Sequence, residues 1–529
     1  MSSHITGCFS EANLPRLTAP LLPHRLTRYN VSRNRQPGER RARRLEEFMK
    51  ELTDSFLNAA QTSGVQYGDI RVIERAHEGI GVKNGKVEEL QRDSDSGFGV
   101  RVLHKGCWGF ASSRELNPDE VARITRLAVE IAEASATLKK EDVRLVDEPA
   151  HRETWITPVK EDPFAVSIED KLKLLLAANE EMRKVAGITN VTSSTDCFRE
   201  HQWFVNTEGS EIEQTIIEAG GGIEAVAVRG NEFQRRSYPN SFRGQYHTAG
   251  FEVVRSYDLV GNAQRIATEA VQLLDAKECP SMTTTLVLDG PQLALQVHES
   301  IGHPIELDRV LGSEAAYAGM SFVTLEKKGG FKYGSDIMHV TADATLPGGL
   351  GSFGFDDDGV QAQRVDIIKD GIFLDYLTNR ETAHIAGNTR SNGTNRADGW
   401  NRIPIIRMTN INLEPGEGSF DDLIADTKDG VYMSTNRSWS IDDRRVNFQF
   451  GTEIAWEIIN GKLGQMLKNP NYTGITPEFW GGLDRICGPD EWVIWGTPNC
   501  GKGQPSQTAH VAHGVAPARF RNVQVGIRG

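Results

Sequence analysis

The chain has 529 residues, and its 59 Lys and Arg residues against 72 Asp and Glu residues give a formal net charge of −13; at about 150 residues per domain, this length predicts two to four domains. With 38% hydrophobic and 25% charged residues and no apolar run near the roughly 18 residues that cross a bilayer, the composition excludes a membrane protein and a coiled coil and indicates a globular protein. Six cysteines without a Cys-x-x-Cys pair exclude a disulfide scaffold and favour reduced thiols in the cytoplasm.

The first 45 residues differ in charge from the rest of the chain. They hold nine Arg, no Lys and two acidic residues, a balance of +7, which leaves −20 for residues 46–529. Because so acidic a body lacks the basic face that phosphate contacts need, we expect no nucleic-acid partner. Residues 1–45 have no apolar stretch of the kind that secretory signals carry, and we expect a disordered basic leader. This leader would lie upstream of a second possible start at Met49, and an organelle transit peptide or a basic arm are the alternatives.

Residues 46–280 are predicted to form an N-terminal domain of mixed α and β structure. Alternating apolar residues and glycine punctuation, with a turn at Asn84-Gly85, predict a meander. Strand patterns occur at 70–73, 97–103, 109–112, 203–205 and 211–218. Helix patterns with start signals begin at Asn117, where Pro118 and Glu120 complete the signal, and at Ser167, and a third spans 259–274.

The composition changes after Cys279-Pro280. Glycines, aromatic residues and short strands dominate from Thr283 onward, so we place a domain boundary at residue 280. Residues 281–529 are predicted to form a mainly antiparallel, β-rich C-terminal domain that carries one notable helix. The expected fold class is therefore α+β.

That helix carries the strongest local signal in the chain. A strand at 284–288 leads into Asp289, which can cap the helix, and His298-Glu299-Ser300-Ile301-Gly302-His303 follows. The motif is similar to the His-Glu-x-x-His pattern of zinc peptidases, with one extra residue between the histidines. On an ideal helix, residues five apart differ by about 140° in azimuth and could not bind one ion. A π-type turn, or a break at Gly302, would let both imidazoles converge. Otherwise the two histidines are unrelated.

Two histidines leave a zinc site short of ligands, because catalytic zinc usually has three protein ligands and a water. The best third candidate is Cys500, which lies among glycines, with Lys502 nearby to favour the thiolate. A lone cysteine is otherwise a small buried hydrophobe. Either His510 or His513 could instead be a ligand or a substrate contact.

Two other matches do not define sites. Residues 349–354 fit Gly-x-Gly-x-x-Gly but lead into Asp356-Asp357-Asp358 rather than into a helix. Three carboxylates would repel a pyrophosphate, which excludes a dinucleotide site. The same acids lack the later residues of an EF-hand, so we expect a solvated turn there.

Taken together, these motifs resemble the TldD/PmbA family of metallopeptidases. The resemblance spans about residues 50–529 and rests on 97–102, 109–111, 298–308, 346–360 and 499–505. It implies an α+β front domain, a β-rich rear domain that binds zinc, and usually a dimer. In this family, metal-binding subunits often pair with metal-free subunits and act on unfolded peptides. Because the chain retains the two histidines, Glu299 and Cys500, it is similar to the metal-binding, catalytic type, although its tail at 510–519 is richer in histidine.

We therefore expect one Zn²⁺ per chain, bound by His298, His303 and Cys500, with Glu299 as the general base. Further contacts to the ligands or the substrate are expected from Glu306, Asp308, Lys502, Gln504 and His513. Glu306 and Asp308 would orient the imidazoles or form surface salt links. Peptide is expected to bind as an added strand.

Two alternatives remain open. Cys500 could be the nucleophile of a cysteine peptidase with His298 as its base. The chain could also be a non-catalytic, peptide-binding or regulatory subunit. The expected assembly is a homodimer, or a heterodimer with a metal-free relative.

Overall fold

The computed structural model describes residues 37–526, with side chains from residue 45 onward. The chain divides into two compact units, Met1–Phe48 and Met49–Gly529. Most of the expected leader lies outside the described residues, and from Pro37 the chain is helical, as part of α1 (Pro37–Ser63). Within the described part, no helix is both long enough and apolar enough to cross a membrane. The fold of the second unit follows.

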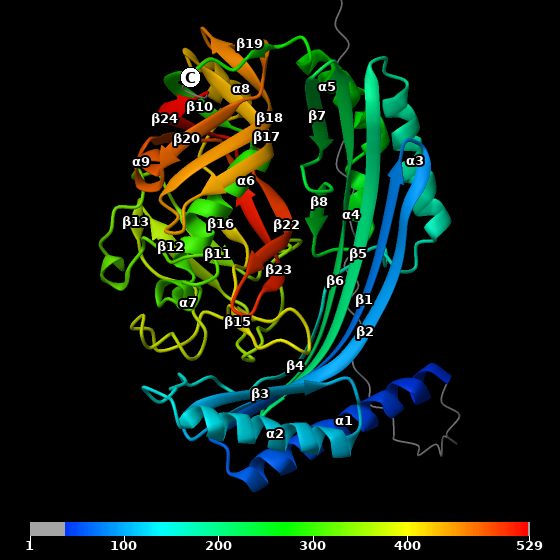
Figure 1. Ribbon diagram of the computed structural model, residues 1–529, viewed down its shortest axis with the longest axis vertical. Helices are drawn as coiled ribbons and strands as arrows, with labels where there is room; N and C mark the ends of the chain where they lie inside the picture. The colour runs from blue at the N-terminus through cyan, green and yellow to red at the C-terminus, as the bar shows by residue number, and fades with distance from the viewer. Residues whose placement is uncertain (1–36, 527–529) are drawn as a thin grey trace, which may run out of the picture. The chain divides into compact units, whose positions relative to one another are not determined.

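The N-terminal half of this unit is built on an eight-stranded sheet, counted within the described residues, with the order β3-β2-β1-β5-β6-β4 and with β7 and β8 also paired to β6. Its strands are β1 (Tyr67–Lys83), β2 (Lys86–His104), β3 (Cys107–Ser113), β4 (Arg152–Ile156), β5 (Ile188–Asn206), β6 (Glu211–Arg229), β7 (Glu232–Tyr238) and β8 (Gln245–His247). Four of these strands are long and lie beside one another (Figure 1). The predicted strands are confirmed, but they are parts of longer ones.

Helices cover this sheet, and three of them begin where the sequence predicts a helix, the exception being the short helix at 252–256. They are α2 (Pro118–Ala136), α3 (Ile168–Arg183), α4 (Glu252–Ser256) and α5 (Leu259–Leu273). Asn117 accepts a hydrogen bond from the N–H of Glu120, and Ser167 accepts one from Asp170, as the capping signals predict. On β3, Gly109 leaves room for α2, because a Cβ there would lie 1.9 Å from the Ala128 oxygen.

The C-terminal half is mainly antiparallel sheet. One eight-stranded sheet, again within the described residues, has the order β17-β10-β24-β20-β18-β19-β9, with β21 paired to β24. Its strands are β9 (Lys277–Glu278), β10 (Met282–Leu288), β17 (Asp429–Ile441), β18 (Asn447–Ile459), β19 (Lys462–Lys468), β20 (Asn471–Ile475), β21 (Leu483–Ile486) and β24 (Ala518–Val525). The predicted α+β class is confirmed, while the boundary at residue 280, between β9 and β10, stays a prediction.

Smaller sheets and short helices complete this half. The strands are β11 (Val340–Asp343), β12 (Arg364–Lys369), β13 (Ile372–Phe373), β14 (Asn395–Arg396), β15 (Ile405–Ile406), β16 (Ile411–Leu413), β22 (Val493–Lys502) and β23 (Gln507–Val515). The helices are α6 (Gly290–Val297), α7 (Leu307–Val310), α8 (Phe420–Ala425) and α9 (Thr476–Gly481). Strands β22 and β23 form a separate hairpin.

The acidic run at 356–358 joins the two halves, and the expectation of a solvated turn there is wrong. All three aspartates are buried. Asp357 pairs with Arg71 of β1 at 3.1 Å, and Asp358 pairs with Arg101 of β2 at 2.7 Å. Burial raises the pKa of Asp356 well above its usual value, and its carboxyl accepts backbone N–H groups, including those of Asp358 and Asn395. The aspartates are buried because arginines of the facing sheet and backbone donors satisfy them.

Candidate metal centre

The helix that carries the two histidines changes its winding where the motif begins. After α6, residues His298–Gly302 form a π-helical turn, η1, and the N–H of His303 donates to the oxygen of His298. This five-residue hydrogen bond is the π-type turn, one of the two arrangements in which the sequence lets both imidazoles converge. The two imidazole rings consequently lie 4.8 Å apart, between centroids, and nearly perpendicular, at 86°.

The π turn is stabilised by hydrogen bonds at Ser300 and by a close contact at Gly302. The Trp480 indole donates to the Ser300 hydroxyl at 2.9 Å, and that hydroxyl donates to the oxygen of Gln296. On Gly302, a Cβ would lie 2.2 Å from the Met408 sulfur. Glycine at this position therefore allows Met408 to approach the turn.

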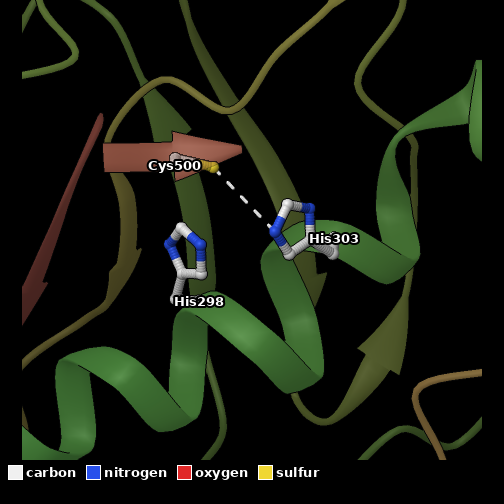
Figure 2. A group of neighbouring side chains, drawn as sticks. All are labelled: His298, His303 and Cys500. Atoms are coloured by element: carbon white, nitrogen blue, oxygen red, sulfur yellow. Dashed lines mark hydrogen bonds between the residues drawn. The ribbon is translucent and has the colours of Figure 1, made fainter. Parts of the chain in front are cut away.

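Cys500, from the β22–β23 hairpin, completes a cluster of three donor side chains (Figure 2). Its Sγ lies 3.9 Å from Nε2 of His303. One donor atom from each of His298, His303 and Cys500 lies within 4.8 Å of the others, and all three side chains are buried. The structure therefore brings together the three residues that the sequence predicts as ligands, in a group that could bind a metal ion.

Hydrogen bonds assign the nitrogen that each imidazole presents. Nδ1 of His303 lies 2.9 Å from the Glu306 carboxylate, which can only accept while ionised, so Nδ1 carries the proton. Nδ1 of His513 likewise donates to the oxygen of Ile411 at 3.0 Å, which leaves Nε2 of His513 to accept from Nδ1 of His298 at 2.8 Å. In both candidate ligands Nε2 is therefore left with its lone pair free.

The electrostatic environment suits neutral imidazoles and a thiolate. Burial lowers the pKa of His298, and lowers that of His303 well below its usual value. Burial acts to raise the pKa of Cys500, but Arg407 and His303 together hold it below its usual value. Arg407 also donates to the backbone oxygen of Cys500. Both directions favour the neutral imidazole and the thiolate, the forms in which these side chains bind metals.

The expectation that Lys502 favours the thiolate stays a prediction, because its ammonium pairs with acids rather than with the Cys500 sulfur. The Lys502 ammonium lies 2.7 Å from the Asp308 carboxylate and 3.4 Å from that of Glu306. Because Glu306 accepts the hydrogen bond from Nδ1 of His303, the charge of Lys502 lies next to the acids that contact the imidazole. Burial acts to raise the pKa of Cys500, and among the charges that lower it Arg407 has the largest effect. Proximity in sequence did not predict it, because the side chain of Lys502 is directed to Asp308.

Glu299 has a partner that the sequence did not indicate. Its carboxylate forms an ion pair with Arg445, from the turn between β17 and β18. Arg445 has a φ of 66°, a left-handed conformation that is uncommon outside glycine. No local pattern marks this arginine, because its role depends on the approach of the β17–β18 turn to η1.

A cleft of about 410 Å³ opens beside the cluster. Its wall includes the three donor residues, Glu299 and Arg445, together with residues 240–242 and 244 from the N-terminal half. Phe242 and Trp439 lie at this cleft with 40% and 43% of their surface exposed.

Two residues named from the sequence lie outside this cleft. Gln504 is exposed and is not part of the wall. His510 pairs with Glu218 at 2.6 Å and lines a second cavity, so the structure does not place it among the donors.

Family models account for most of the chain. The PmbA/TldA metallopeptidase domain 1 matches residues 68–132, the central domain matches 161–276, and the C-terminal domain matches 281–526. The chain belongs to the TldD/PmbA family of metallopeptidases.

Relatives with similar sequences are named as metalloproteases. A metalloprotease of Methanocaldococcus jannaschii is 32% identical over 411 residues, which cover 77% of this chain and 86% of the relative. A TldD homologue of Buchnera aphidicola, also named a metalloprotease, is 25% identical over 499 residues, which cover 90% and 98%.

Solved structures share the fold at low sequence identity. A Thermotoga maritima protein described as a modulator of a DNA gyrase has a TM-score of 0.72 at 18% identity, over 90% of this chain and 100% of that one. TldE from Thermococcus kodakarensis has a TM-score of 0.63 at 16% identity, over 89% and 100%. At these identities the likeness concerns the fold alone.

Proposed function

We propose that this chain is a zinc-dependent peptidase that cleaves extended or unfolded peptides, with one zinc ion per chain bound by His298, His303 and Cys500. The observation that carries this proposal is the convergence of two Nε2 lone pairs and one sulfur beside Glu299 in a cleft. Imidazole nitrogen and thiolate sulfur are the donors that zinc prefers. When bound, zinc would lower the pKa of a coordinated water towards 7 and polarise the scissile carbonyl.

Glu299 is the proposed general base. It follows the first candidate ligand directly and lines the cleft, where its carboxylate can accept a proton from the attacking water and then donate it to the leaving amine. Arg445 fixes the orientation of this carboxylate through their ion pair. The guanidinium also places a positive charge on the cleft wall, where it can stabilise developing negative charge on the substrate.

The edge of β22 is the proposed docking surface for the substrate backbone. Within the described residues, β22 forms its ladder with β23 alone, so its other edge is unpaired. The Gln245 side chain occupies part of that edge, at Ile494 and Gly496. Residues 497–501 continue along the cleft. An extended peptide could add there through main-chain hydrogen bonds, which a folded protein could not present.

The aromatic pair at the cleft supports a preference for apolar substrate side chains. The rings of Phe242 and Trp439 meet edge to face, with centroids 5.3 Å apart. The backbone of Phe242 has a φ of 58°, a left-handed conformation that is uncommon outside glycine. Exposed apolar surface beside a cleft is typical of binding sites.

Metal analysis of purified protein, combined with a cleavage assay, tests the proposal. Wild type should contain about one zinc per chain, Cys500→Ala should lose it, and Cys487→Ala, which removes another buried free cysteine, should keep it. Glu299→Gln should keep zinc and bind peptide but lose turnover. Cleavage of an unfolded chain should exceed cleavage of the same chain folded. Turnover that survives Glu299→Gln would show that Glu299 is not the base.

The alternatives give different results in the same assays. A cysteine peptidase would keep its activity in a chelator and lose it to a thiol alkylator without metal. In that mechanism His303, rather than His298, is the imidazole beside the Cys500 sulfur. A non-catalytic subunit would bind peptide without turnover in the wild type.

We also propose that the chain forms a dimer, with a second copy or with a metal-free relative. The similarity in fold to TldE supports a pairing between related chains. Light scattering of the purified chain, alone and with a metal-free relative, would determine the assembly.

A further inference from the structure

A second cavity, of about 390 Å³, is also bordered by the β22–β23 hairpin. Residues 508–510 of β23 form part of its wall, and strands β5 and β6 of the large sheet contribute to the rest. Ala509 lines this cavity and is the strand partner of Cys500, which lines the first. One hairpin therefore borders both cavities.

The acidic residues of this cavity all have partners. Each carboxylate in its wall contacts an arginine or a histidine. The pairs are Asp93 with His77, Asp95 with Arg114, Glu200 and Asp398 with Arg75, Glu218 with His510, and Asp357 with Arg71. Two of these carboxylates share Arg75, and the histidines of the other pairs carry a positive charge only when they are protonated.

One arginine of the wall, Arg396, has no such partner. Arg75 pairs with acids of the cavity and Arg199 pairs with Asp162, whereas Arg396 forms no ion pair with any carboxylate of the described residues. Burial, and to a smaller extent Arg407, lower the pKa of Arg396 to about 10, so the guanidinium is charged at neutral pH. A charge left unpaired in a partly buried position is costly.

The guanidinium of Arg396 is held in a fixed orientation. Its Nη2 donates to the backbone oxygens of Met408 and His510, and its Cζ lies 5.3 Å from the centre of the Phe353 ring. Nε is buried without a hydrogen-bond partner. Nη1 has no partner among the described residues either, but it is not among the buried atoms, so it remains accessible from the cavity. Donor hydrogens are therefore presented to a ligand.

We propose that this cavity binds a carboxylate attached to an apolar group, with Arg396 as the anion-binding residue. The remaining Nη1 donor of this charged guanidinium can form a charge-assisted hydrogen bond to a carboxylate oxygen. Ile216, Phe198 and Phe353 supply apolar surface in the same wall. The carboxylate could be the C-terminus of a peptide or belong to a small free acid. This site is independent of zinc binding and of peptide cleavage.

Calorimetry on the full chain tests the site with N-acetyl-L-phenylalanine and its uncharged amide. Because a metal ion could also bind a carboxylate, both ligands are titrated into untreated and chelator-treated protein. The acid should bind at least about tenfold more tightly than the amide in both preparations. Equal binding of acid and amide, or acid binding that is lost with the metal, would overturn the proposal. This comparison needs no variant.

Variants then locate the site. Arg396→Gln should remove the preference for the acid, and Arg396→Lys should restore part of it. Arg199→Gln changes another arginine of the same wall and should keep the preference in full. Acid preference that persists in a folded Arg396→Gln protein would contradict the assignment.

A hexapeptide that ends in phenylalanine, as acid and as amide, distinguishes the two sources of the carboxylate. Tighter binding of the peptide acid than of N-acetyl-L-phenylalanine identifies a peptide C-terminus as the ligand. Equal binding of these two acids identifies a small acid as sufficient. Both results support a carboxylate site, and no acid preference for either ligand opposes it.

Discussion

Nε2 of His513 lies 2.8 Å from Nδ1 of His298, and this contact determines which nitrogen of His298 is free to bind a metal. His513 is itself oriented by its hydrogen bond to the oxygen of Ile411. A residue that does not belong to the donor cluster therefore orients one of its members, as is common for histidine ligands in metal sites.

Replacing His513 with alanine should weaken zinc binding by about 10- to 100-fold, because Nδ1 of His298 loses its acceptor. Competition with a chromophoric chelator would measure the change. His510→Ala is the matched control, since His510 lies three residues earlier on β23 but pairs with Glu218 in the second cavity. Equal zinc affinity in the wild type and both variants would contradict this role.

The effect of Arg407 on Cys500 should appear as a pH dependence of zinc binding. In Arg407→Gln the pKa of Cys500 should rise, because burial then acts with less opposition. Metal binding displaces the thiol proton, so zinc affinity should fall about tenfold per pH unit below the raised pKa and match wild type above it. Titrations between about pH 6 and pH 9 would show this divergence towards low pH.

Arg407→Lys is the control for that experiment, because it retains the positive charge. It should stay closer to wild type at low pH than Arg407→Gln. A loss of zinc affinity that is the same at every pH would indicate a packing defect rather than an effect on the thiol.

The aromatic pair at the cleft should affect substrate binding more than chemistry. Phe242→Ala should raise KM for peptides with apolar side chains by roughly tenfold, because apolar contact area is lost, and should leave zinc content unchanged. Phe233→Ala is a matched control, since Phe233 is similarly exposed, at 46%, but does not line the cleft. An unchanged KM in Phe242→Ala would exclude this ring from the substrate site.

Packing at the π turn predicts a stability defect. Gly302→Ala should lower the free energy of unfolding by about 1–3 kcal/mol, because its Cβ would overlap Met408. Denaturant unfolding would measure the cost, and adding Met408→Ala should reduce it. Gly481→Ala, at a position with no atom within 4 Å of the new Cβ, should have little effect. A similar cost at both glycines would contradict the packing argument.

Much of the fold could be predicted because caps and periodicity act over a few residues. The starts of α2 and α3 follow from Asn117 and Ser167, whose side chains cap the next turn. The length of β2 could not be predicted, because residues 86–95 are almost all exposed and carry no alternation of buried and exposed side chains. Pairing with β1 holds that part of the strand in the sheet.

The candidate site divides in the same way. The sequence by itself determined the donor types and limited the local arrangements in which His298 and His303 can converge, and the structure shows the π turn among them. Only the tertiary structure decided the partners of these groups. The contacts of Arg407 with Cys500, Arg445 with Glu299 and His513 with His298 span 93, 146 and 215 residues.

The aspartates at 356–358 follow the same rule, since they are buried against arginines of β1 and β2. The physical reason is that these hydrogen bonds and ion pairs join side chains far apart in the sequence. Which of them meet depends on how the strands pack against one another. Lys502, two residues from Cys500, is directed to Asp308, whereas Arg407 reaches Cys500 from the end of β15.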